Sequence, residues 1–98
     1  MSVEQLQTVV AVAEEGSLVR AARRLHLTQP PVSRRLLALE DELGVSLFHR
    51  RARGVEPTEA GERFLPHARA ILAALEQASQ AARGLRSGPL ANDGSGRT

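Results

Sequence analysis

The stretch Ala-Ala-Arg-Arg-Leu-His-Leu-Thr-Gln-Pro-Pro-Val-Ser, residues 21–33, decides the fold. Its first half closes a short amphipathic helix over residues 18–25, whose apolar side recurs at helical spacing. That apolar side consists of Leu18, Ala21, Ala22 and Leu25. Its second half opens another helix, because two successive prolines fit only in a first turn, where backbone N–H groups have no acceptor within the helix. Two helices joined by residues 26–28, with small side chains at the crossing, predict a helix-turn-helix.

The segment before this unit is also helical. Residues 3–15 carry apolar side chains at helical spacing, and Ser2 followed by Gln5 predicts a capping box at the start. Gly16 is expected to end this helix and Ser17 to cap the next.

The helix that opens with the prolines is expected over residues 29–43, ending at Gly44. The side chains expected to face inward are Val32, Leu36, Leu39 and Leu43. Those expected on the opposite side, with Ser33 flanking, are Pro30, Arg34, Leu37 and Asp41. Packing within this domain does not explain an exposed Leu37. The Thr28 hydroxyl is expected to be free, because the prolines lack the N–H groups that it would cap.

Beyond Gly44 the spacing of apolar residues changes from the spacing typical of a helix to the spacing typical of strands. Residues 47–50 and 55–57 flank residues 51–54, which predicts a two-stranded hairpin, with Gly54 free to adopt a positive φ. Pro57 confines its strand to an edge or an end. A hairpin after a helix-turn-helix is a wing, and its tip is expected to carry Arg51 and Arg53.

A long helix is expected from Thr58, its N-cap, to residue 86. A heptad seam runs along it, made of Phe64, Ala68, Ile71, Leu75, Ala78, Ala82 and Leu85. Leu65 and Leu72 form a second stripe that could lie against the small domain, and Pro66 predicts a bend. A helix of about 42 Å is too long for this domain to cover, which favours pairing with a second chain over simple packing on its own domain.

Charge is concentrated in the middle of the chain. Residues 20–53 hold eight arginines and three acids, a net of +5, whereas the remainder holds five arginines and eight acids. A basic middle third is typical of a phosphate-facing surface, although a solvated surface would look the same.

Other classes of protein find no support. Cysteine is absent, and His26, His49 and His67 lack metal-ligand spacing, so neither metal nor cofactor is expected. No nucleophile–base arrangement and no phosphate-binding loop is present, which argues against an enzyme. The start lacks the basic region of a secretory signal, and no apolar run is long enough for a membrane span. A cytoplasmic location is expected, without membrane partners.

Five segments together resemble the N-terminal domain of LysR-type transcriptional regulators. They are residues 13–18, 21–33, 39–44, 47–50 and 58–61, in order and correctly spaced, within a match covering about residues 3–86. The resemblance implies a mainly α winged helix-turn-helix of three helices and a two-stranded wing in residues 1–57. A linker helix, residues 58–86, would pair two chains, and residues 87–98 form a polar tail that is expected to be disordered.

By the same resemblance, the chain binds inverted-repeat promoter sites on double-stranded DNA as a homodimer or a dimer of dimers, at the bacterial nucleoid. The expected DNA-binding residues are Thr28, Gln29, Pro30, Pro31, Ser33, Arg34, Arg51 and Arg53. Gln29 suits adenine, Ser33 can donate or accept, the prolines offer apolar contact, and a wing arginine suits a narrow minor groove. Each of these side chains, taken singly, also fits a solvated surface.

The resemblance implies that family members continue into a larger domain that binds a small inducer, and no such effector site is expected in this sequence. The chain is expected to be either an excised fragment or a natural short form. An alternative function is a protein-interaction module that pairs with a full-length LysR-type regulator through the 64–85 seam and acts as a dominant negative.

Overall fold

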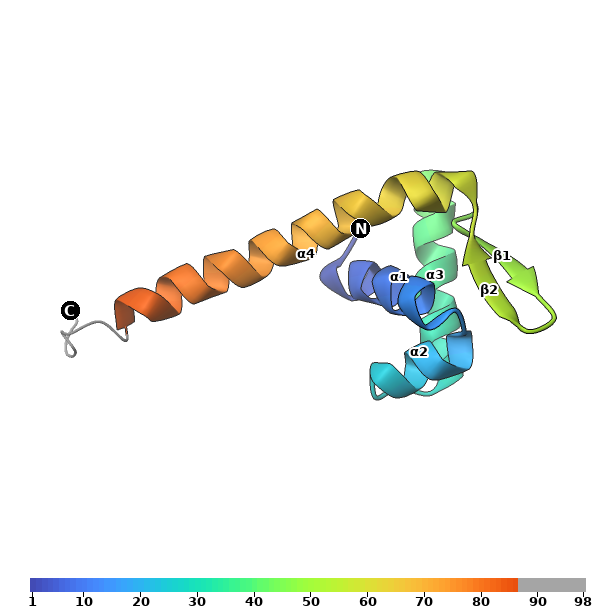
Figure 1. The fold of residues 1–98 in the computed structure, drawn as a ribbon, viewed down its shortest axis with the longest axis horizontal. Coiled ribbons are helices and arrows are strands. Elements are labelled where there is room, and N and C mark those ends of the chain that lie inside the picture. Colours follow the sequence, from blue (N-terminus) through green and yellow to red (C-terminus); the bar gives the residue numbers. More distant parts are fainter. Residues whose placement is uncertain (87–98) are drawn as a thin grey trace.

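The computed structural model describes residues 1–86, apart from the side chains of the last two, and shows an elongated molecule of 56 × 25 × 19 Å (Figure 1). Its elements are α1 (Val3–Glu15), α2 (Leu18–Arg24), α3 (Gln29–Leu43), β1 (Phe48–Arg51), β2 (Gly54–Pro57) and α4 (Glu59–Arg86). The predicted mainly α winged helix-turn-helix with a long following helix is confirmed. The predicted tail, residues 87–98, and the side chain of Leu85 lie outside the described residues.

Helix α1 lies at the centre of the domain, and α2, α3 and α4 all pack against it. Val9 and Val12 of α1 are fully buried, together with Val32 and Leu39 of α3. Burying one such side chain contributes roughly 1.5–3 kcal/mol, so these contacts hold the three-helix unit together. Thr8 is buried as well, and its hydroxyl donates to the Glu4 carbonyl (2.8 Å), which satisfies the buried polar group.

The local signals that begin and end the first helices are confirmed. Ser2 and Gln5 form the capping box, Ser17 Oγ accepts the Arg20 N–H (3.1 Å), and Gly16 ends α1 with φ 65°. The prediction of α2 is one residue too long, because the helix ends at Arg24.

The turn after α2 is closed by backbone hydrogen bonds. The Leu27 N–H donates to the Ala22 carbonyl (2.8 Å) and the His26 N–H to the Arg23 carbonyl (3.2 Å). His26 itself has φ 59°. This is the Schellman arrangement, in which the left-handed position is usually glycine. The turn therefore begins at Leu25, and the sequence around His26 gave no signal of it.

The two strands form an antiparallel hairpin, the wing (residues 48–57), with a two-residue turn at Ala52 and Arg53. Gly54 has φ 143°, as the sequence predicted, and Val55 donates its N–H to the Gly16 carbonyl (3.1 Å). A Cβ at Gly54 would lie 2.3 Å from that same oxygen. The wing is thus held against the turn between α1 and α2 by a contact that only glycine permits.

Thr58 joins the wing to α4. Its hydroxyl accepts the Gly61 N–H (3.0 Å), as predicted for an N-cap, and donates to the Ser46 carbonyl (2.7 Å). Helix α4 then continues without interruption through Pro66, which is exposed. It leaves the small domain and extends well beyond it (Figure 1).

The side of α4 that faces the domain differs in part from the prediction. Leu65 is buried and Leu72 is packed against the core, as expected for the second stripe. Ala68, however, has no exposed surface, and Phe64 is half-buried against the same core. The assignment of Ala68 to the dimer seam is therefore wrong, because close packing of α4 on α1 encloses this small side chain. The exposed part of the seam begins at Ile71.

Candidate nucleic-acid interface

The start of α3 projects into solvent. Thr28, Gln29 and Pro30 are exposed, and the Thr28 side chain makes no capping hydrogen bond, as the prolines predicted. Pro31 is half-buried beside the fully buried Val32, so it offers less surface than Pro30. The first turn of α3 thus presents polar groups and one exposed proline ring.

The next turn of α3 adds Ser33, which is half-buried, and Arg34, which is exposed. Within residues 1–86 no acidic side chain forms an ion pair with Arg34. Arg34 lies on the face of α3 opposite its buried stripe and Ser33 lies at the edge of that face, as the helical spacing predicted. Their charge and hydrogen-bonding capacity remain available to a ligand.

The wing places its arginines in three different environments. Side chains alternate between the two faces of a strand, so Arg50 shares the face of the buried Phe48, whereas Arg51 lies on the outer face. On that outer face Arg51 pairs with Glu56 (3.2 Å). Arg53 lies in the turn, and no acid among the described residues pairs with it. The predicted tip of two arginines is therefore one arginine, since Arg51 is the last residue of β1.

A hollow of about 340 Å³, the wing groove, lies between the wing and the helix-turn-helix. It is lined by Ser17, Leu18, Val19, Gln29, Arg50, Arg51, Ala52, Arg53, Gly54 and Val55. The start of α3 and the tip of the wing both lie on the side of the domain away from α4 (Figure 1). The groove therefore joins the two segments that sequence reasoning proposed as a shared binding surface.

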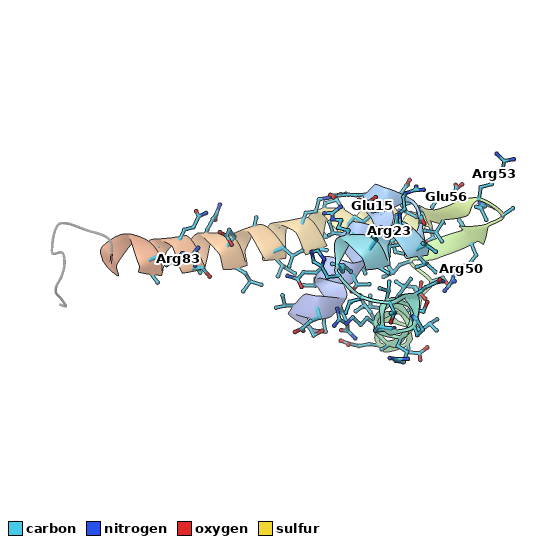
Figure 2. All side chains as sticks on the ribbon, turned by 90° about the horizontal axis from the view of Figure 1, so that it is seen from below. Glu15, Arg23, Arg50, Arg53, Glu56 and Arg83 are labelled. Atoms are coloured by element: carbon cyan, nitrogen blue, oxygen red, sulfur yellow. The ribbon has the colours of Figure 1, made fainter. Side chains whose placement is uncertain are left out.

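Seven of the ten groove residues were not among the predicted site residues, and Arg50 and Val19 are the two of them with exposed side chains larger than that of alanine. Figure 2 shows Arg53 extending from the end of the wing and Arg50 from its edge nearer α3. Strand alternation from Phe48 was a signal that could have found Arg50. No comparable signal marks Val19, which is exposed on α2.

Acids and bases pair with one another mainly away from the wing groove. Glu14 of α1 pairs with Arg24 of α2 (2.8 Å) and Arg69 of α4 (3.5 Å). The hydrogen bond from Arg24 is the main reason that the pKa of Glu14 lies below its usual range, and Arg69 acts in the same direction. These pairs tie three helices together, whereas Arg23, Arg34 and Arg53 have no acidic partner within residues 1–86. The surface around α3 and the wing is thus left with uncompensated positive charge.

Residues 3–62 match the family model described as "Bacterial regulatory helix-turn-helix protein, lysR family". The chain belongs to the LysR family. The described residues form a LysR-type winged helix-turn-helix DNA-binding domain, which confirms the resemblance seen in the sequence.

Curated relatives of this LysR-type domain are named as transcriptional regulators. It is 56% identical over 72 residues to the regulator ClcR of Pseudomonas putida, an overlap of 74% of this chain and 24% of that protein. It is 47% identical over 88 residues to BudR of Klebsiella aerogenes, an overlap of 90% and 62%. The chain therefore spans about a quarter of ClcR and less than two thirds of BudR.

Solved structures with the same fold include several complexes with DNA. The LysR-type domain superposes on the CbnR DNA-binding domain in its DNA complex with a TM-score of 0.82 and 45% identity, covering 87% of this chain and 98% of that one. For the BenM DNA-binding domain with catB site 1 DNA, the TM-score is 0.85 at 38% identity, covering 90% and 99%.

Residues 1–86 contain no group of three or more metal-ligating side chains. None of the described helices is both long and apolar enough to cross a lipid bilayer.

Proposed function

We propose that this domain binds an inverted-repeat promoter site on double-stranded DNA as a homodimer joined through α4. The observation that carries the proposal is the wing groove, in which Gln29 at the start of α3 and Arg53 at the wing tip line one hollow. A duplex that receives α3 in its major groove meets the wing at the adjacent backbone or minor groove.

The start of α3 has the chemistry needed to read bases. Gln29 forms a bidentate pair with adenine N6 and N7, and Ser33 donates to or accepts from several base edges. The exposed ring of Pro30 offers an apolar surface, and the free Thr28 hydroxyl suits a phosphate oxygen. Arg34 on the same face reaches a base edge or the backbone.

The wing supplies the second contact. Arg53 in the turn enters a narrow minor groove, where the negative potential is strongest. Arg50 faces the groove from β1 and neutralises a phosphate between the two contacts. Of the two predicted wing residues, Arg51 contributes less to DNA binding than Arg53, because Glu56 already pairs with Arg51.

Dimerisation is proposed through the exposed apolar face of α4, which runs from the segment packed on the small domain into the length beyond it. Ile71 and Leu75 are 42% and 43% exposed there, and Ala78 and Ala82 continue the same stripe in exposed positions. Phe64, which is half-buried, lies at the near end of this stripe, and the heptad spacing of the sequence continues to Leu85. Apolar side chains at heptad spacing allow the α4 helices of two chains to pack against each other. The resulting dimer has twofold symmetry, so the DNA site that it binds is expected to be symmetric as well.

Selection from a random duplex library tests the proposal. We expect a palindromic consensus whose half-sites are about one helical turn apart or a multiple of it, because each protomer places one α3 in the major groove. A consensus without twofold symmetry would exclude the dimeric arrangement. The absence of any enriched sequence would exclude sequence-specific binding.

A further inference from the structure

Leu37 lies on the outward face of α3 with 51% of its surface exposed. Within α3 it is the one large hydrophobic side chain that is exposed. Its neighbours along that face are Ser33 and Arg34 before it and Asp41 after it. Packing inside the domain does not use this side chain, so its apolar surface is available to a ligand.

Leu37 lies on the same face of α3 as the residues proposed to read bases. Leu37 follows Pro30 by seven residues, which at about 100° per residue places the two on the same line along the helix, about 10 Å apart. Ser33 and Arg34 lie between them. A helix seated in the major groove, which is about 12 Å wide, therefore carries Leu37 over the same stretch of base pairs.

We propose that Leu37 is a specificity-determining residue that contacts the C5-methyl group of a thymine in the major groove. The inference rests on the proposed DNA-binding mode of α3. Phosphates and most base edges are polar, and the thymine methyl is the apolar group that the major groove displays. Leucine at this position therefore favours thymine over cytosine, which carries no methyl group.

A second protein copy is a poorer occupant for this surface. Protein interfaces are built on contiguous apolar patches, whereas Leu37 is flanked on α3 by Arg34 and Asp41. The uncompensated arginines nearby attract a polyanion instead.

A double-mutant cycle on the selected duplex tests the contact. Each thymine of one half-site is replaced in turn by deoxyuridine, which removes only the methyl group. For the unaltered protein, one replacement weakens binding about fourfold, the factor that corresponds to one buried methyl-sized group. For Leu37→Ala, the same replacement leaves the dissociation constant unchanged. Fluorescence anisotropy measures all four combinations.

Val45→Ala is the matched control, because Val45 is an exposed aliphatic residue beyond the end of α3, 45% exposed. In this variant the fourfold effect of deoxyuridine persists. Additive effects of Leu37→Ala and deoxyuridine at every thymine, or a selected half-site without thymine, would overturn the assignment while leaving DNA binding by α3 intact. Failure of the unaltered protein to prefer any duplex would overturn it together with the proposed function.

Discussion

The wing carries three arginines, Arg50, Arg51 and Arg53, which differ in what they can contribute to DNA binding. All three line the wing groove, but Arg51 is also paired with Glu56 at 3.2 Å, and Arg53 occupies the turn. An arginine already paired with a carboxylate adds little net positive charge to a surface. The distinction between these residues is therefore one of neighbours and strand face rather than residue type.

Arg53→Ala is expected to weaken DNA binding and to reduce the slope of log K against log salt by about one, because a cation in the minor groove also displaces one counterion from the DNA. Arg51→Ala is expected to change the slope less, since Glu56 already neutralises Arg51. Fluorescence anisotropy over a salt series measures the slope for both variants. Arg83→Ala, at the far end of α4 (Figure 2), is the control and should leave the slope unchanged. Equal slopes for Arg51→Ala and Arg53→Ala would contradict the assignment.

Glu14→Gln is expected to flatten the acid side of the stability profile. The pKa of Glu14 lies below its ordinary value of 4.5, because Arg24 and Arg69 stabilise the carboxylate. A carboxyl whose pKa is lower in the folded state stabilises the protein above its unfolded pKa and loses this contribution as pH falls through the folded pKa. Because Glu14 is 41% exposed, the contribution is less than about 1 kcal/mol. Urea unfolding from pH 6 down to 3 measures the free energy of unfolding of the unaltered protein and of Glu14→Gln. Identical pH profiles for the two would rule out this contribution of Glu14.

At the scale of elements, the wing is positioned by its contact with the turn between α1 and α2. Gly54 sits against the Gly16 carbonyl, which also accepts the Val55 N–H (3.1 Å). The oxygen belongs to the backbone, so no flexible side chain can move aside for an added Cβ. The reach of Arg53 relative to α3 therefore depends on a residue that needs no contact with DNA.

Gly54→Ala is expected to lower the free energy of unfolding by roughly 1–3 kcal/mol through an unfavourable φ, and further through the clash with Gly16. Gly44→Ala is the matched control, since Gly44 also has a positive φ (75°) but no atom within 4 Å of an added Cβ. Gly44→Ala should lower the free energy of unfolding by about 1 kcal/mol. Denaturant unfolding gives both values, and anisotropy should show weaker DNA binding for Gly54→Ala alone. Equal losses of stability would mean that the Gly16 contact is unimportant.

At the scale of the whole molecule, α4 is longer than the domain that it leaves. Leu65, Ala68 and Leu72 attach its first half to the core, whereas Ile71 and Leu75 lie on another face of the helix and are exposed. An exposed apolar stripe on a projecting helix is stable when another helix covers it. The same helix thus supports the domain at one end and is available to a partner at the other.

Leu75→Glu is expected to convert the proposed dimer into a monomer, because burying an unpaired carboxylate between two helices costs several kcal/mol. Sedimentation at tens of micromolar would show the change, and circular dichroism should show an intact fold, since Leu75 is exposed within its own chain. Ala73→Glu places the same charge on the opposite side of α4 and should leave the dimer intact. A monomeric unaltered protein under these conditions would exclude pairing through α4.

Much of the fold follows from residues that act on their near neighbours. Ser2 and Gln5 cap α1, Gly16 and Gly44 end helices, and Pro30 and Pro31 require α3 to begin within one turn of them. These effects operate within one turn of backbone. The family resemblance and the exposed start of α3 could be derived in the same way, since motif order and helical spacing are properties of the chain itself.

Tertiary packing decided what depended on residues far apart in the chain. The burial of Ala68 under α1, the pairing of Arg51 with Glu56 across the hairpin, and the closure of Gly54 on Gly16 each join segments whose separation in space no local pattern specifies. Amino-acid sequence alone therefore determined which helices and strands form and which surface is basic. Only the packed structure determined which arginines remain unpaired and where the exposed part of α4 begins, because both depend on what a second element covers.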